Sequence, residues 1–89
     1  MPTVIIRGKL EKSYDHWVAA FDDHESARKA VGLNVLYRGY DLNDSGAIHI
    51  VMHTPSMDTL SKFMQDNAEY IEESGNTPGS TELTVCSDM

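Results

Sequence analysis

The middle of the chain, residues 33–54, reads LNVLYRGYDLNDSGAIHIVMHT. Two runs rich in β-branched and aromatic residues flank the segment DLNDSG, whose residue types favour tight turns. We therefore predict a strand over residues 33–40, a hairpin loop over 41–46 and a second strand over 47–54. The segments on either side of this hairpin decide what packs against it.

A helical pattern lies on each side of the hairpin. Before it, apolar residues recur at spacings of three and four over residues 17–31, behind a serine that can cap a helix. After it, a second such stripe occupies residues 57–71, again behind a serine. A glycine follows each helical segment, as is typical of helix ends. We predict continuous helices over residues 14–31 and 57–74.

Alternating β-branched segments begin and end the chain, at residues 3–10 and 81–87. The predicted order is βαββαβ, which indicates an α+β ferredoxin-like sandwich. In that fold one four-stranded antiparallel sheet carries two helices on one face. Eighty-nine residues are enough for one such domain, so we expect a single domain over residues 1–89.

Because strand residues alternate between faces, the sheet residues can be sorted into two sets. The set predicted to lie under the helices, the covered face, is almost wholly apolar. It consists of Val4, Ile6, Leu10, Leu33, Val35, Tyr37, Ile48, Ile50, Met52, Leu83 and Val85.

The other set, the open face, has an apolar centre surrounded by polar groups. It consists of Ile5, Arg7, Lys9, Leu36, Arg38, Tyr40, His49, Val51, His53, Thr84 and Cys86. This composition favours an interface, and we expect a homodimer that packs one open face on another. Arg7, Arg38 and His49 are the residues expected to bind an anion or the partner there. The alternatives are an acidic partner and a solvated sheet face.

The net charge of −7 argues against nucleic acid and anionic membranes as partners, because an acidic domain repels phosphate. No apolar run approaches the ~20 residues of a membrane span. The first residues lack the features of a signal peptide, and the single cysteine, Cys86, cannot form a disulfide within the chain. We expect a cytoplasmic protein.

No residue pattern indicates a metal or a cofactor. His49 and His53 have the spacing of a zinc-binding helix, but on a strand four residues span about 13 Å, which is too far for one ion. No glycine-rich phosphate loop and no catalytic triad spacing is present. We predict neither a metal nor a cofactor.

Two polar residues interrupt the apolar stripes, His24 in the first helix and Asn67 in the second. Two polar side chains that face an apolar sheet are typical of a small-molecule pocket, whose lining is mostly apolar with a few polar groups. Its predicted lining is Trp17, Phe21, His24, Tyr37, Met52, Phe63, Met64 and Asn67. His24 and His49 are the candidates for a general base. Alternatively, His24 is a histidine at the edge of the core, hydrogen-bonded to a neighbour, Asn67 occupies a partly exposed edge position, and His49 belongs to the dimer interface.

Three short motifs carry a resemblance to a known family. They are WVAAFD at residues 17–22, YRG at residues 37–39, and LSKF at residues 60–63 with the Asp-Asn pair that follows. With its element order, the chain resembles the dimeric α/β-barrel superfamily, which contains the antibiotic-biosynthesis monooxygenases, stress-responsive barrel proteins and polyketide cyclases. It is still more similar to a family of short domains of unknown function from marine cyanobacteria and other marine microbes.

The resemblance implies a homodimer with face-to-face sheets and a hydrophobic cavity between helices and sheet. It also implies that any enzyme of this kind uses histidine, tyrosine, tryptophan or asparagine without metal or flavin. Our leading hypothesis is a protein that binds a small hydrophobic molecule, fatty-acid-like or an aromatic acid, whose acid is held by Arg7, Arg38 or His24. The alternatives are a cofactor-free monooxygenase or cyclase with a histidine base, and a structural or regulatory dimer without ligand.

Overall fold

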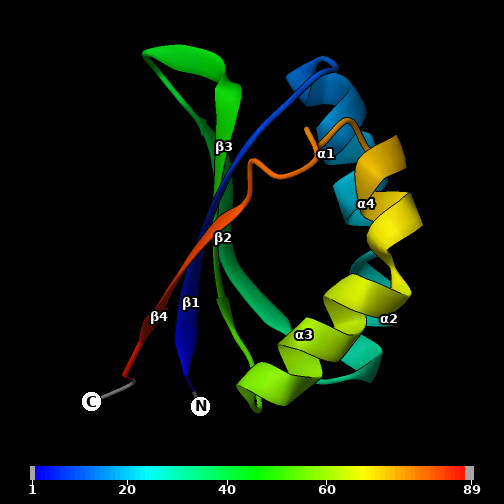
Figure 1. Ribbon diagram of the computed structural model, residues 1–89, viewed down its shortest axis with the longest axis vertical. Helices are drawn as coiled ribbons and strands as arrows, with labels where there is room; N and C mark the ends of the chain where they lie inside the picture. The colour runs from blue at the N-terminus through cyan, green and yellow to red at the C-terminus, as the bar shows by residue number, and fades with distance from the viewer. Residues whose placement is uncertain (1, 88–89) are drawn as a thin grey trace.

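A computed structural model describes residues 2–87 and shows a four-stranded antiparallel sheet with all helices on one side (Figure 1). The strands lie in the order β2-β3-β1-β4. This confirms the predicted ferredoxin-like α+β fold. The elements are β1 (Thr3–Lys9), α1 (Tyr14–Asp23), α2 (Glu25–Ala30), β2 (Asn34–Asp41), β3 (Asp44–His53), α3 (Met57–Asp66), α4 (Ala68–Glu73) and β4 (Glu82–Cys86).

The prediction of two continuous helices was wrong, because each helical segment is broken at its polar residue. His24 lies between α1 and α2, and Asn67 lies between α3 and α4. At Asn67 the side-chain Nδ2 donates to the carbonyl of Phe63 (2.8 Å), which also accepts from the backbone N–H of Asn67. A side chain that bonds to the preceding turn in this way is a recognised cause of helix bending.

The hairpin between β2 and β3 is tighter than predicted. β3 begins at Asp44, so only Leu42 and Asn43 separate the strands. The carboxylate of Asp41 accepts from the N–H of Asn43 (2.8 Å), and that of Asp44 accepts from the N–H of Gly46 (3.0 Å). Residues of the predicted loop therefore supply both the turn and the start of the strand.

A β-bulge in β2 reverses part of the predicted face assignment. Val35 pairs with Met52 and Tyr37 with Val51, so Leu36 is the extra residue. Beyond this point every side chain changes face. Tyr37 lies on the open face, whereas Arg38 and Tyr40, opposite Ile50 and Ile48, lie on the covered face. The predicted faces of these three residues were wrong.

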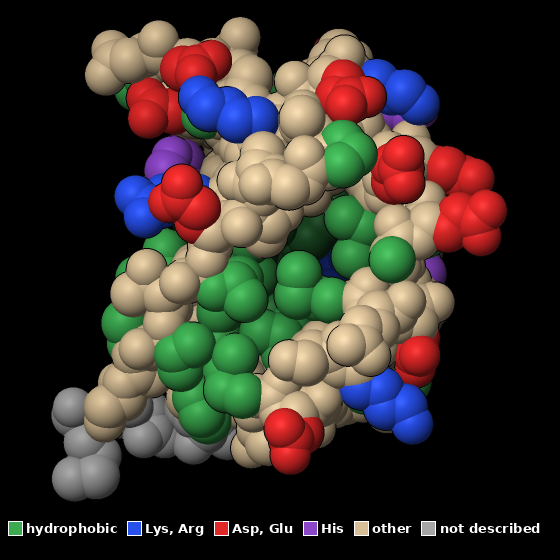
Figure 2. All heavy atoms as spheres, viewed as in Figure 1, with side chains coloured by type: hydrophobic (Ala, Val, Ile, Leu, Met, Phe, Trp, Pro, Cys, Tyr) green, Lys and Arg blue, Asp and Glu red, His purple; other side chains and the backbone are tan. Residues whose placement is uncertain are grey.

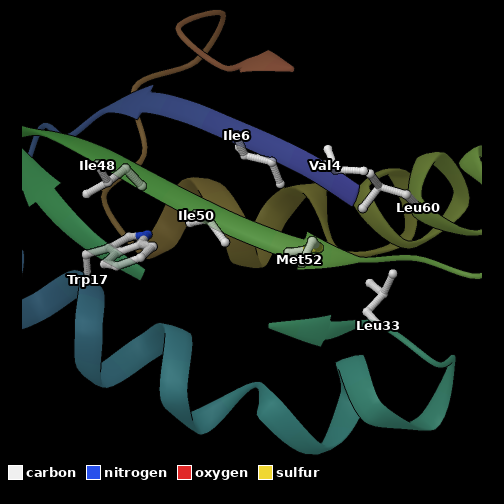
Figure 3. Close-up of a cluster of buried hydrophobic side chains, with 8 residues drawn as sticks. All are labelled: Val4, Ile6, Trp17, Leu33, Ile48, Ile50, Met52 and Leu60. Carbon is white, nitrogen blue, oxygen red and sulfur yellow. The ribbon is translucent and has the colours of Figure 1, made fainter. Parts of the chain in front are cut away.

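The other strands follow the predicted alternation. β1 and β3 pair Val4 with Met52 and Ile6 with Ile50 on the covered face. Their side chains extend toward the helices, where they meet side chains from the helical layer and the start of β2 (Figure 3). The buried core consists of Val4, Ile6, Trp17, Leu33, Ile48, Ile50, Met52 and Leu60.

The helices leave the β4 side of the covered face open. Leu83 and Val85 pair with Ile6 and Val4, so they share the face of the core, yet they are 43% and 49% exposed. Figure 2 shows hydrophobic side chains gathered around a hollow between the sheet and the helices. The covered face is therefore exposed along β4, while the core residues beneath the helices stay buried. Among residues 2–87, no helix is long and apolar enough to cross a membrane.

Candidate functional site

The hollow leads to a cavity of about 100 Å³ between the sheet and the helices. Its floor is the covered face of β1 and β3, and its roof comes from all four helices. The lining is mostly apolar, with a few polar side chains among the hydrophobic ones. An apolar cavity of about 150 Å³ holds benzene, so this one, with about two thirds of that volume, suits a group smaller than a benzene ring.

One wall of the cavity is a column of stacked groups along α1 and α2. The rings of Trp17 and Phe21 stack at 4.7 Å between centroids. The guanidinium of Arg28 lies over the ring of Phe21, 3.8 Å from the ring centroid. Positions 17, 21 and 28 share a helix face because their spacings are multiples of about 3.6 residues. The column places a positive charge at the end of an aromatic wall.

Arg28 is the most unusual group of the cavity. It is only 6% exposed, and its Nε–H is buried without a hydrogen-bond partner among the described residues. No carboxylate of residues 2–87 forms an ion pair with it. Burial lowers the pKa of Arg28 because it disfavours the charged form, while the more distant carboxylates of Glu25 and Asp22 oppose the shift.

His24 and Asn67, the two helix breaks, are bonded to each other. Nε2 of His24 lies 2.7 Å from Oδ1 of Asn67, while Nδ2 of Asn67 donates to the Phe63 carbonyl. A carbonyl can only accept, so the amide must direct its Oδ1 at the imidazole. His24 therefore carries its proton on Nε2, and in the neutral ring Nδ1 holds the lone pair. Among the described residues, nothing bonds to Nδ1.

Tyr70 of α4 holds the imidazole from one side. Its ring stacks on that of His24 at 4.1 Å, and its hydroxyl donates to the carbonyl of Ala20 (2.7 Å). Burial raises the pKa of Tyr70, and the negative charge of Asp23 adds to the shift. The tyrosine is thus bonded to α1 and packs its ring against His24.

A second unpartnered polar group lies in the loop before β4. Asn76 donates from Nδ2 to the hydroxyl of Thr81 (3.2 Å), but its Oδ1 is buried without a partner. This oxygen lies 3.0 Å from where a Cβ of Gly8 would be, so a side chain at that position would collide with the amide. Gly8, Asn76 and Thr81 all line the cavity.

Most of the predicted lining residues meet at this cavity. Six of them line it, namely Trp17, Phe21, His24, Met52, Phe63 and Met64. Asn67 does not reach the cavity but acts on it through His24. Tyr37 lies on the open face and is 54% exposed, because the bulge at Leu36 turned it away.

Arg7, Arg38 and His49 all lie outside the cavity. Arg38 forms two bonds to Asp22 of α1, at 2.9 and 2.8 Å, instead of facing an anion on the open face. Arg7 and His49 pair across β1 and β3 on the open face as expected. Each has an acidic neighbour, since Arg7 bonds to Glu82 (3.2 Å) and His49 lies 3.7 Å from Asp41.

Sequence reasoning missed Arg28 and Asn76. Arg28 continues the series Trp17, Phe21, His24 at spacings of four, three and four, which is the pattern of one helix face. The periodicity could have found it, but the predicted stripe was built from apolar residues and His24 alone. Asn76 had no such signal, because its position depends on the path of the loop over Gly8.

The cavity thus offers a cation, an unpartnered amide and a histidine with a free lone pair against an apolar background. Such a site can hold an acidic molecule and can accept a proton from it. Among residues 2–87, no three His, Cys, Asp or Glu side chains are grouped so as to hold a metal ion.

Solved structures share this fold across nearly the whole chain. The protein Atu4242 from Agrobacterium tumefaciens has a TM-score of 0.70 at 12% identity, covering 100% of this chain and 94% of its own. SnoaB, a cofactor-independent oxygenase from Streptomyces nogalater, has a TM-score of 0.69 at 7% identity, covering 99% and 92%. An antibiotic biosynthesis monooxygenase has a TM-score of 0.66 at 12% identity, covering 100% and 99%. At these identities the likeness is one of fold.

None of the curated proteins matches the sequence. A family model does, over residues 1–88, and its description is Domain of unknown function (DUF3764). The match covers nearly the full length of the chain, from the first strand to the last. The chain therefore belongs to the DUF3764 family.

Proposed function

We propose that the protein binds a small, partly apolar acid between its helices and its sheet, and that Arg28 holds the acidic group. The carrying observation is the burial of Arg28 in an apolar cavity without a carboxylate partner from residues 2–87. Arg7 and Arg38, the anchors expected from sequence, are engaged with Glu82 and Asp22 outside the cavity. In this proposal Arg28, rather than Arg7 or Arg38, binds the acidic group of the ligand.

The energies favour a functional Arg28 over a structural one. Removing an ion from water costs several kcal/mol even after the protein relaxes. The compensation consists of the contact with Phe21, for which a desolvated cation–π interaction contributes about 2 kcal/mol, and the attraction of the more distant charges of Glu25 and Asp22, which form no ion pair with the guanidinium. An anionic ligand would recover the part of the desolvation cost that is not compensated, through a charge-assisted hydrogen bond to the guanidinium.

The cavity also limits the ligand. At about 100 Å³ it takes a short chain or part of a ring, and a longer ligand would continue over the open β4 side of the covered face, where Leu83 and Val85 are exposed. Both side chains are exposed and apolar, so they suit the continuation of an aliphatic or aromatic ligand. A short fatty acid or an aromatic acid fits both features.

Binding is tested with hexanoate and hexanol, which differ in the acidic group. Trp17 is the single tryptophan of the chain and lines the cavity, so its fluorescence reports occupancy. We expect hexanoate to bind the wild-type protein more tightly than hexanol, and Arg28→Met to abolish that preference. Arg7→Met, on the open face, is the matched control. Equal binding of acid and alcohol by the wild type, or no binding of either, contradicts the proposal.

A second candidate function is oxygenation or cyclisation without a cofactor, with His24 as the base. The observation that favours it is the bond from Asn67, which leaves Nδ1 of His24 with the lone pair in the neutral ring. SnoaB, which shares the fold, is itself a cofactor-independent oxygenase. Oxygen uptake with a panel of phenols and dicarbonyl acids tests this reading. Uptake should fall in His24→Gln and persist in His49→Gln, whereas equal rates in both variants would remove it.

We further propose that the open face binds a second copy of the chain. Ile5 and Val51 pair at its centre, and the bulge adds the exposed ring of Tyr37. The face is also less basic than expected, because Arg38 has left it and Arg7 and Lys9 bond to Glu82 and Asp44. A surface of balanced charge suits an identical copy better than an acidic partner.

A further inference from the structure

Within residues 2–87, two buried side-chain polar atoms lack partners, and both belong to residues that line the cavity, at different ends of it. The backbone carbonyl of Arg28 accepts from the N–H of Leu33. Arg28 therefore lies near the start of β2, where Val35 pairs with Met52. Asn76 lies against Gly8, which pairs with Ile48. Met52 and Ile48 are four residues apart on one strand, a distance of about 13 Å. Figure 3 shows Leu33 beside Met52 and Trp17 beside Ile48 at the two ends.

We infer that the ligand is a small hydroxy acid, whose acid is bound by Arg28 and whose hydroxyl is bound by the amide of Asn76. This inference rests on the proposed function and adds the second group of the ligand. The Arg28 end supplies N–H donors and a positive charge, which select an anion. The Asn76 end supplies an uncharged amide, which selects a neutral polar group.

The chemistry of the Asn76 end favours a hydroxyl. Oδ1 is the free atom while Nδ2 donates to Thr81. The Thr81 hydroxyl can also donate, so a rotated amide would present Nδ2 to the cavity instead. A ligand hydroxyl both donates and accepts, and it satisfies the amide in either orientation. A second carboxylate would be repelled by Oδ1.

Water is the competing occupant of the Asn76 end. A buried water usually makes about three hydrogen bonds, and the polar side-chain groups that the lining offers it at this end are the Asn76 amide, the Thr81 hydroxyl and the indole N–H of Trp17. A ligand hydroxyl needs fewer partners because the rest of the molecule is held by the apolar wall and Arg28. If water does occupy this end, adding a hydroxyl to the ligand brings no gain in affinity.

The test compares matched acids with and without a hydroxyl. Benzoate is compared with its ortho-, meta- and para-hydroxy derivatives, and hexanoate with ω-hydroxyhexanoate, by calorimetric titration of the wild type. We expect at least one hydroxy acid to bind about tenfold more tightly than its parent, the effect of one well-placed buried hydrogen bond. Asn76→Ala should abolish this gain, so that the hydroxy acid binds no more tightly than its parent to the same variant.

Two controls keep the outcomes apart. Asn43→Ala changes an asparagine of the exposed hairpin turn and should keep the gain. If Asn76→Ala fails to fold, Asn76→Ser and Thr81→Val report on the same amide. A wild type that binds none of the acids overturns the proposed function and this inference together. Acids that bind through Arg28 without any gain from a hydroxyl, or a gain that survives in Asn76→Ala, overturn this inference alone.

Discussion

Arg28 brings a positive charge into an apolar cavity, and it does so without a carboxylate from residues 2–87. In the ligand-free protein this charge should cost stability. We expect Arg28→Met to leave the free energy of unfolding unchanged or to raise it by up to ~2 kcal/mol, since an unsatisfied buried group is replaced by an apolar one of similar length. Urea denaturation measures the change.

Arg38→Met is the matched control, because Arg38 forms a two-point ion pair with Asp22. It should lower stability by about 1 kcal/mol, the upper range for a pair that is partly exposed. A loss of more than ~2 kcal/mol in Arg28→Met would mean that the arginine stabilises the fold by itself. Its burial would then carry no functional meaning.

Asn67 is predicted to control the tautomer of His24. Asn67→Ala removes both the acceptor for Nε2–H and the bond to the Phe63 carbonyl, and should lower stability by about 1–2 kcal/mol. Nitrogen chemical shifts of the imidazole should show pure Nε2–H tautomer in the neutral wild type and a mixture in the variant. His16 is an internal control, since its Nε2 faces the carbonyl of Glu73 and should stay unchanged. Identical His24 shifts in both proteins would contradict this.

The two residues that interrupt the apolar stripes were identified from the sequence, but only part of their structural role was predicted. His24 and Asn67 were expected to face a pocket, and His24 does line it. That they end one helix and begin another, and that they bond to each other, depends on how the two helical segments lie side by side. Periodicity within one segment carries no information about such a contact.

At the scale of elements, the bulge in β2 determines which side chains reach the helices. It places Arg38 on the covered face, where it meets Asp22 and the hydroxyl of Tyr14. A regular strand would direct Arg38 to the open face. Sequence alternation could not reveal the bulge, because the run from Val35 to Tyr37 is apolar at every position and fits either register.

A double-mutant cycle on Arg38 and Asp22 tests the bulge. With Arg38→Met and Asp22→Asn, we expect a coupling energy of about 0.5–1 kcal/mol, which a two-point contact between partly exposed groups supports. The same cycle on Arg7 and Glu82, which make a single contact with more exposed side chains, should give a smaller value. No coupling between Arg38 and Asp22 would mean that β2 is regular.

For the molecule as a whole, the two faces of the sheet have separate predicted roles. The covered face bounds the ligand cavity, and the open face meets a second copy. Val51→Asp should split the dimer at micromolar concentration, because an unpaired carboxylate in an apolar interface costs several kcal/mol. Light scattering after size-exclusion chromatography measures the mass.

Leu42→Asp is the control for this variant, since Leu42 is 91% exposed in the hairpin turn. It should leave the dimer intact. A Val51→Asp protein that remains dimeric places the interface elsewhere, and a wild type that is monomeric removes the dimer altogether. Neither result affects the ligand cavity, which is formed within one chain.

The fold could be predicted from the sequence because strand and helix periods are local properties. The residue order gave βαββαβ, and alternation in β1, β3 and β4 sorted both faces correctly. The lining of the cavity was predicted in its apolar part, through residues such as Trp17 and Phe63 that lie on clear stripes, and in His24. Its charge was not predicted, because the periodicity places Arg28 on the same helix face but does not show that its guanidinium is buried there.

The most direct test of the account is the Nε–Hε resonance of Arg28 in a ¹⁵N-labelled protein titrated with benzoate. The chain has three arginines, and the signal of Arg28 is assigned by its loss in Arg28→Met. We predict that this resonance shifts in a saturable manner as the carboxylate binds, while those of Arg7 and Arg38 stay in place. A titration in which the Arg28 resonance does not move, or moves no more than the other two, would contradict the claim that this arginine holds an acidic ligand.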